Sequence, residues 1–310
     1  MLTPARAQKI RKLKTDIKLD RQLYLMMIPA LIWYIVFQFY PMYFLQIAFK
    51  DYKPFLGIAK SDWVGFKHFE IFFKSPYFFR TLKNTLMISL YSLCMNFPSA
   101  LILALLYNEV KNRIFVKISQ TIAYMPHFIS AVVVAGMMIT FLSPSSGVVN
   151  QIIERFGGES VYFLADAKYF RIIYTLMNLW HGVGFSSIIF IAALQAVDQE
   201  LYEAATIDGA GKMGQVWHVT IPGILPTIII QLILAVGNLL SVGYETIILL
   251  YQPATYETAD VISTYVYRSG LQEGNYSFAT AVSIFNSIIS LLLVAGVNRI
   301  SRSLSETSLW

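Results

Sequence analysis

Long apolar stretches without a single Asp, Glu, Lys or Arg alternate along the chain with segments that carry the charges. Six stretches have this character: residues 22–49, 84–108, 118–153, 172–197, 213–244 and 274–298. Each is longer than the roughly 20 residues that a helix needs to cross the hydrocarbon core of a bilayer. The pattern therefore predicts a polytopic membrane protein.

We expect six membrane-spanning helices, at residues 22–48, 84–107, 120–142, 172–196, 222–250 and 276–298. Helices are expected because backbone groups in lipid must be hydrogen-bonded within their own segment, and the alternating pattern of a barrel strand is absent from the sequence. The predicted fold class is all-α, with a basic tail at 1–21, a six-helix domain at 22–298 and a second tail at 299–310.

Composition supports this class and excludes others. Charged residues make up 14% of the chain, against about 25% in an ordinary soluble domain, and 56% of the residues are hydrophobic. The single cysteine, Cys94, excludes an intrachain disulfide and a cysteine-based metal site. The net charge is +6, but the sequence lacks the basic and aromatic motif of a nucleic-acid-binding protein, so no nucleic-acid partner is predicted.

The N-terminal tail carries seven Lys or Arg residues, which favours a cytoplasmic N-terminus. With six spans the C-terminus and the loops 108–119 and 197–221 then also lie inside. The count of Lys and Arg over all loops barely favours this orientation. The decision rests on the tail and on the short inner loop with Lys111, Arg113 and Lys117.

Loop 197–221 differs from the other loops. Residues 198–208 have the pattern of a short amphipathic helix, and Gly209 and Gly211 permit a turn with positive φ after it. A second short amphipathic piece, with Trp217, leads to Pro222. The pattern alone fits either a hairpin lying on lipid or a surface that another protein approaches closely.

The order Glu203-Ala204-Ala205, Asp208-Gly209-Ala210, Ile221-Pro222 and Pro226 resembles the EAA loop of ABC importer permeases. Val219 and Ile221 are mild departures, because the family commonly has Ile and Leu there. The residues Trp63 to Phe69, Phe78-Phe79-Arg80 and Asn84-Thr85-Leu86 are similar to the segment before the second span in the sugar-permease branch. The resemblance covers roughly residues 20–300.

This resemblance implies a type I importer permease fold in a bacterial cytoplasmic (inner) membrane. It also implies four kinds of partner: a second homologous permease, two cytoplasmic ATPase subunits, an extracytoplasmic solute-binding protein and an oligosaccharide. By resemblance, the coupling helix and its turn comprise Glu203, Ala204, Ala205, Asp208 and Gly209. Glu203 would contact the ATPase, the alanines would allow close approach, and Gly209 would reverse the chain.

No nucleotide site is predicted on this chain, so ATP would bind to the partner ATPase. The segment Gly209-Ala210-Gly211-Lys212 looks like part of a phosphate-binding loop, but Thr206 and Met213 stand where that motif needs Gly and Ser or Thr. No enzymatic activity is expected, since the spans contain no converging acid–base or metal set.

Polar residues inside the spans are candidates for the substrate path, because such residues are costly when they face lipid. The candidates are Tyr124, His127, Asn178, Trp180, His181, Gln231, Asn238, Tyr244 and Glu245. Three candidates in the fifth span, Gln231, Asn238 and Glu245, are seven residues apart and would lie near one side of a continuous helix. Hydrogen bonding between helices is the alternative role for each candidate.

The leading hypothesis is a permease for an oligosaccharide, and the alternative is a secondary transporter driven by an ion gradient. Residues 50–83 carry seven Lys or Arg against three Asp or Glu. Positive potential at an entrance attracts anions, so this excess favours an acidic, uronate-containing sugar. Contacts of these lysines with lipid headgroups or with an acidic face of the binding protein would explain it equally well.

Overall fold

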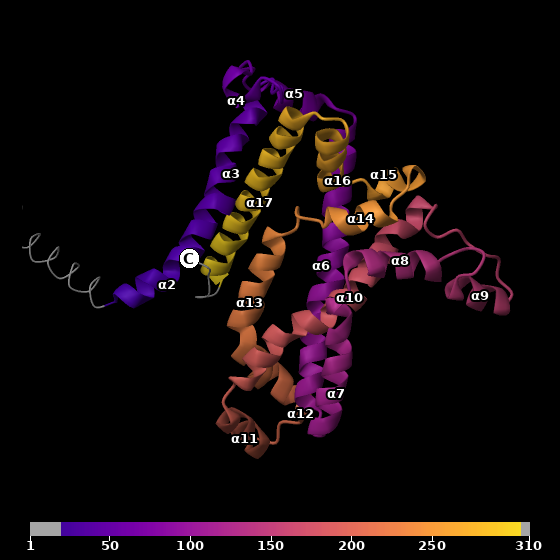
Figure 1. Cartoon of the computed structure of the whole chain (residues 1–310). Helices are drawn as coiled ribbons and strands as arrows, with labels where there is room; N and C mark the ends of the chain where they lie inside the picture. Colours follow the sequence, from indigo (N-terminus) through magenta and orange to yellow (C-terminus); the bar gives the residue numbers. More distant parts are fainter. Residues whose placement is uncertain (1–19, 305–310) are drawn as a thin grey trace, which may run out of the picture.

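The computed structural model describes residues 20–304, which form helices and one isolated antiparallel bridge between Lys50 and Trp63 (Figure 1). The predicted tail at 1–21 lies outside the described residues except for its last two, as does the end of the tail at 299–310. The longer helices are α2 (Arg21–Tyr34), α6 (Tyr77–Glu109), α7 (Arg113–Tyr124), α8 (Ala131–Phe141), α10 (Ala167–Gln195), α13 (Ile221–Gly237) and α17 (Tyr276–Leu304). The shorter ones are α3 (Tyr40–Met42), α4 (Gly57–Lys60), α5 (Lys67–Lys74), α9 (Val148–Arg155), α11 (Gln199–Ile207), α12 (Lys212–Gln215), α14 (Tyr244–Leu250), α15 (Tyr256–Ala259) and α16 (Ile262–Tyr267).

Five helical segments of the described part are long and apolar enough to cross a membrane. They are Arg21–Phe49, Tyr77–Glu109, Ala167–Gln195, Lys212–Gly237 and Tyr276–Ser303, and a bent pair of helices would make a sixth. The all-α prediction is confirmed, and the predicted spans one, two, four and six each fall on one of these segments. Turns of other helical types interrupt or extend some of them: η1 (Ile35–Phe39), η2 (Tyr43–Phe49) and η4 (Val216–Thr220).

The prediction of one continuous helix for the third span, at 120–142, is wrong, although the bent pair can still form that span. The segments Arg113–Phe128 and Ala131–Phe141 meet at an angle of 97°. Pro126 lies in the tight turn η3 (Met125–Phe128), and Ile129 and Ser130 are extended. The Ser130 hydroxyl then accepts a hydrogen bond from the Val133 amide and begins α8 as its cap.

The prediction of one fifth span at 222–250 is also wrong, because α13 ends at Gly237 and α14 begins at Tyr244. Neighbouring side chains bind the carbonyl groups that the break exposes. Ser89 donates to the Leu239 carbonyl, Asn286 to that of Leu240 at 3.2 Å and Ser263 to that of Val242 at 2.9 Å. Broken helices are tolerated at membrane depth only where such partners exist.

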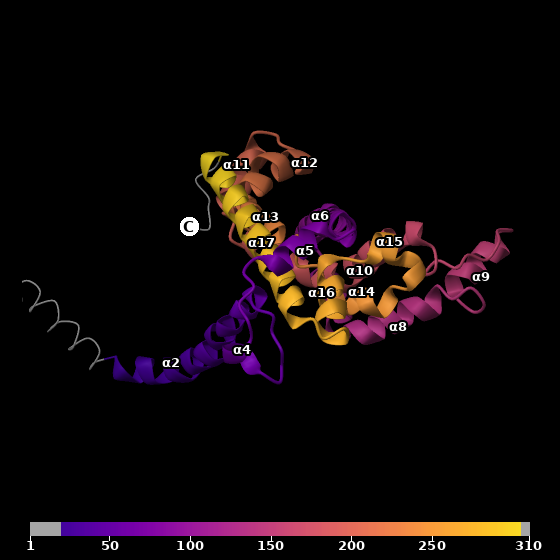
Figure 2. The same ribbon diagram turned by 90° about the horizontal axis from the view of Figure 1, so that it is seen from above.

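Helices α6 and α10 pack along each other at the centre of the molecule (Figure 1). Ala100 and Ala104 of α6 are buried against Phe190 and Leu194 of α10, and small residues permit such close approach. Seen from above, α2 and α9 project to opposite sides of this centre (Figure 2). Helices α11 and α12 lie at one end of the bundle, and α4, α5 and α16 lie at the other (Figure 1).

Candidate functional site

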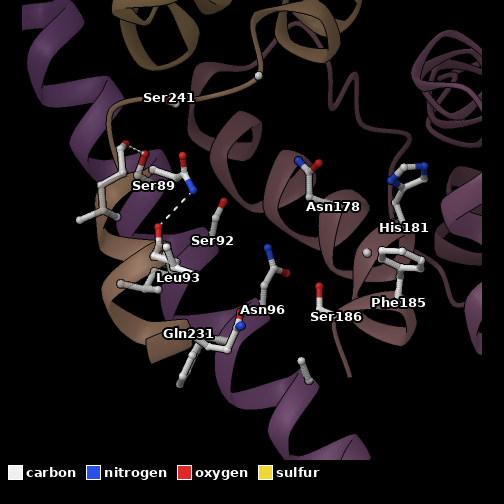
Figure 3. Close-up of a pocket in the computed structure, with 18 of the residues that line it drawn as sticks. Ser89, Ser92, Leu93, Asn96, Asn178, His181, Phe185, Ser186, Gln231 and Ser241 are labelled. Atoms are coloured by element: carbon white, nitrogen blue, oxygen red, sulfur yellow. Dashed lines mark hydrogen bonds between the residues drawn. The ribbon is translucent and has the colours of Figure 1, made fainter. Parts of the chain in front are cut away.

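A cavity of about 830 Å³ lies between α6, α10, α13 and the break at 238–243 (Figure 3). Its polar lining consists of Ser89, Ser92 and Asn96 of α6, His127 of η3, Tyr174, Asn178, His181 and Ser186 of α10, Gln231 of α13, and Asn238 and Ser241 of the break. Asp, Glu, Lys and Arg are absent from the lining within residues 20–304. The cavity therefore offers hydroxyls, amides and imidazoles, but no permanent charge.

Helical spacing places the lining residues of α6. Ser89, Ser92 and Asn96 are three and four residues apart and so share one face of the helix. Figure 3 shows Ser92 and Asn96 on one side of the cavity and Asn178 and Ser186 of α10 on the other. Polar groups from two packed helices thus converge on one space.

Two histidines and Phe185 form an aromatic cluster in the lining, which also includes the rings of Phe97, Tyr174 and Phe190. The ring of His127 stacks on that of Phe185 with 3.9 Å between ring centroids, and the His181 ring lies 5.6 Å from that of His127. His181 Nε2 lies 3.0 Å from the Ile129 carbonyl oxygen, which fixes its ring at the bend of the third span. His127 Nδ1 is buried without a hydrogen-bond partner.

The cavity brings together five of the nine predicted path residues: His127, Asn178, His181, Gln231 and Asn238. The other four, Tyr124, Trp180, Tyr244 and Glu245, lie outside its lining. Trp180 is 45% exposed, and Tyr244 stacks on Tyr267 with 5.7 Å between ring centroids. Glu245 does not share a helix face with Gln231 and Asn238, because α13 ends at Gly237 and Glu245 belongs to the separate helix α14.

Sequence reasoning missed the contribution of α6 to the cavity. Ser89, Ser92 and Asn96 sit in an otherwise apolar stretch at helical spacing, which is the signal that could have revealed them. Ser89 is 7% exposed, and its hydroxyl donates to the Leu239 carbonyl in the break. This hydroxyl therefore stabilises the wall of the cavity.

The predicted coupling helix forms as α11. The Asp198 carboxylate caps it by accepting from the Glu200 amide at 3.0 Å, and Gly209 ends it with a φ of +80°. The turn is tied back to the helix, since Gln215 Nε2 donates to Thr206 Oγ1 at 2.9 Å. From Lys212 the chain stays helical through η4 into α13.

The residues assigned to coupling lie mostly at the surface. Glu203, Ala204, Asp208 and Gly209 are exposed, and Ala205 is half-buried. Large apolar side chains are exposed on the same loop: Ile207 at 86%, Met213 at 71% and Trp217 at 61%. Exposed large apolar side chains beside a charged residue are typical of a surface that another protein or lipid covers.

At the opposite end of the bundle, a buried carboxylate holds two arginines. Asp260 is fully buried, and both Arg80 and Arg268 bind it, with nitrogen–oxygen distances of 3.0 and 2.9 Å. Burial alone would lower the pKa of the Arg268 guanidinium, but its hydrogen bonds and charge attraction to Asp260, together with its interaction with Tyr251, outweigh burial and raise that pKa. One of the seven cations counted in residues 50–83, Arg80, is thereby neutralised.

Comparison with known proteins agrees with this architecture. The family model described as "Binding-protein-dependent transport system inner membrane component" matches residues 96–306. Protein LplB of Bacillus subtilis (strain 168) is 43% identical over 95% of this chain and 92% of its own length. The polygalacturonan/rhamnogalacturonan transport system permease protein YteP of the same organism is 42% identical over 98% of this chain and 94% of its own length.

A solved structure is similar over almost its whole length. It belongs to a bacterial ABC transporter involved in the import of the acidic polysaccharide alginate, with 47% sequence identity and a TM-score of 0.87. The match covers 95% of this chain and 99% of the other. The resemblance seen in the EAA-like loop is thus confirmed over nearly the entire chain: it has the type I importer permease fold and belongs to the family of inner-membrane components of binding-protein-dependent ABC transport systems.

Proposed function

We propose that this chain forms half of the translocation path of an ABC importer for an acidic oligosaccharide. The observation that carries the proposal is the cavity between α6, α10 and α13, whose hydroxyl, amide and imidazole groups suit a polyhydroxylated cargo. Amides and hydroxyls hydrogen-bond sugar hydroxyls, and an aromatic ring such as Phe185 offers an apolar surface for a sugar face. His127, Asn178, His181, Gln231 and Asn238 are the predicted path residues that would contact it.

The acidic character of the cargo is supported by two relatives. The name of YteP includes polygalacturonan and rhamnogalacturonan, and the similar solved transporter is involved in the import of alginate, an acidic polysaccharide. A second solved structure of that transporter, with a TM-score of 0.88 and 47% identity over 96% of this chain, holds a periplasmic protein bound to an alginate pentasaccharide. An extracytoplasmic binding protein is therefore the expected donor of the cargo.

The remaining parts of the importer follow from the same proposal. Two ATPase subunits would bind and hydrolyse ATP, and one would dock on the exposed face of α11 with Glu203, Ala204, Ala205, Asp208 and Gly209. A second homologous permease would complete the path as a heterodimer. Both termini would be cytoplasmic, on the side of α11, and residues 22–298 would form the membrane domain.

The test is uptake of a labelled trigalacturonate into proteoliposomes that hold both permeases, the ATPase and the solute-binding protein. We expect uptake to require enclosed ATP and the binding protein, and to continue when ionophores remove the proton and sodium gradients. The purified chain alone should hydrolyse no ATP. Uptake that follows an ion gradient without ATP would instead establish the secondary-transporter alternative. Preference for neutral galactotriose would refute the acidic cargo alone.

A further inference from the structure

The carboxylate of Asp260 is fully occupied by its own neighbours. Its Oδ1 accepts from Arg268 Nη1 at 3.2 Å and from Thr264 Oγ1 at 2.9 Å. Its Oδ2 accepts from Arg80 Nη2 at 3.0 Å and from Arg268 Nη2 at 2.9 Å. Four donors use the hydrogen-bonding capacity of the two oxygens, so Asp260 has none left for a third arginine.

A third arginine, Arg171, lies beside this cluster without an acid of its own. Its Nη2 donates to Asn84 Oδ1 at 2.9 Å, while Asn84 Nδ2 donates to the backbone carbonyls of Glu257 and Asp260. Arg171 Nε is buried without a partner. Within residues 20–304, the ion pairs include none to Arg171. The half-buried guanidinium therefore carries an uncompensated charge, which is costly unless something binds it.

The position of this charge relates it to the cavity. On α10, Arg171 precedes Tyr174 by one turn, and on α6, Asn84 precedes Ile88 by one turn; both Tyr174 and Ile88 line the cavity. One turn corresponds to about 5 Å of helix rise. Arg171 lies close to the start of α10 and Asn84 in the first turns of α6, and both helices begin away from α11 (Figure 1). An unpaired cation thus stands just above a cavity that has no charged lining.

We infer that Arg171 is an anion-recognition residue at the outer entrance of the cavity, where it binds a carboxylate of a uronate oligosaccharide as the sugar enters. The inference rests on the proposed function. A guanidinium presents several N–H donors in a plane and binds carboxylates by charge-assisted hydrogen bonds. Asn84 holds one donor and so fixes the side chain, while no acceptor for the other donors is found among residues 20–304. The uncharged cavity between α6, α10 and α13 then binds the sugar hydroxyls and does not hold the carboxylate tightly.

The test compares binding of trigalacturonate with binding of its neutral methyl ester. Calorimetry on the assembled complex of both permeases and the ATPase, without binding protein, gives the two affinities. We expect the wild type to prefer the acid by about tenfold, the lower range of a charge-assisted hydrogen bond. Arg171→Met should abolish this preference, and Arg171→Lys should keep most of it. The control Lys168→Met removes a cation from the same end of α10, one that pairs with Asp166 at 3.1 Å, and should keep the preference.

Several results would overturn the inference. The first is equal affinity of the wild type for acid and ester, and the second is an acid preference that survives in Arg171→Met. Loss of binding together with thermal stability in both Arg171 variants would show that the residue only supports Asn84. A preference seen only when the binding protein is present would assign the carboxylate to that protein. In each case ATP-dependent uptake by the wild type would leave the proposed function intact, whereas absence of that uptake would remove both.

Discussion

Lys212, the first residue of α12, forms an ion pair of 2.9 Å with Glu109, the last residue of α6. The pair joins the end of a cavity-lining helix to the turn that follows α11. Both side chains are well exposed, at 68% and 37%, so the pair contributes about 1 kcal/mol or less to stability. Its importance is positional, because it links the proposed ATPase-docking loop to the wall of the cavity.

Reversing one charge of this pair should therefore affect coupling more than folding. In Glu109→Lys, two cations face each other, and we expect the thermal midpoint of the complex to stay nearly unchanged while less sugar is imported per ATP hydrolysed. The double variant Glu109→Lys/Lys212→Glu restores the attraction and should restore the ratio. Parallel measurement of uptake and hydrolysis in proteoliposomes checks this, and an unchanged ratio in the single variant would count against it.

Gly209→Val should weaken docking of the ATPase through the backbone alone. A Cβ at Gly209 would meet no atom within 4 Å, but its φ of +80° is unfavourable for a β-branched residue by about 1–3 kcal/mol. Gly211→Val is the matched control, since Gly211 also has open space and a φ of −68°. Co-purification of the ATPase with each variant gives the readout. Equal recovery with both variants would show that the turn is not needed for docking.

The sequence predicted the spans better than their interruptions. Uncharged apolar runs require helices in lipid, which fixed the places of α10 and α17. The same uncharged run continues through the break at 238–243, so the absence of charge contains no sign of it. Whether a helix breaks there depends on side chains far along the chain, such as Ser89 and Asn286, that bind the freed carbonyls.

The candidate site was predicted in part for a related reason. Asn178 and His181 are polar residues three apart on one face of α10, and the cavity faces that side. Trp180 lies between them in sequence but outside the lining of the cavity, on another side of the helix. Polarity alone does not indicate the rotational position of a helix. The prediction that Glu245 shares a face with Gln231 and Asn238 is wrong, because it required one continuous helix and the helix is broken between α13 and α14.

Gly184→Ala should destabilise the packing of α10 against α7. An added Cβ at Gly184 would collide with the Ala123 backbone carbonyl, whereas a Cβ at Gly182 would meet no atom within 4 Å. Overpacking against a rigid backbone costs roughly 1–3 kcal/mol. We therefore expect a lower thermal midpoint for Gly184→Ala and a midpoint close to that of the wild type for Gly182→Ala. Equal midpoints for the two variants would contradict the close contact between the helices.

Asp260→Asn should loosen the segment 256–268 from α6. The substitution leaves Arg80 and Arg268 without the only carboxylate that binds them among residues 20–304, and breaking such a buried pair costs about 3–5 kcal/mol. Thermal unfolding of the complex should show the loss, and hydrogen exchange should rise in residues 256–267. Asp62→Asn removes an exposed carboxylate from the same end of the molecule and should change neither.

The cost of Asp260→Asn should arise from the uncompensated arginines rather than from a lost contact. Adding Arg268→Met to Asp260→Asn removes one of the two stranded cations while keeping an apolar stem of similar length. Because a buried ion pair can often be replaced by apolar groups without loss, the double variant should regain part of the thermal stability. If the double variant is less stable than Asp260→Asn alone, Arg268 stabilises the fold through contacts other than Asp260, such as its position over the rings of Tyr256 and Tyr265.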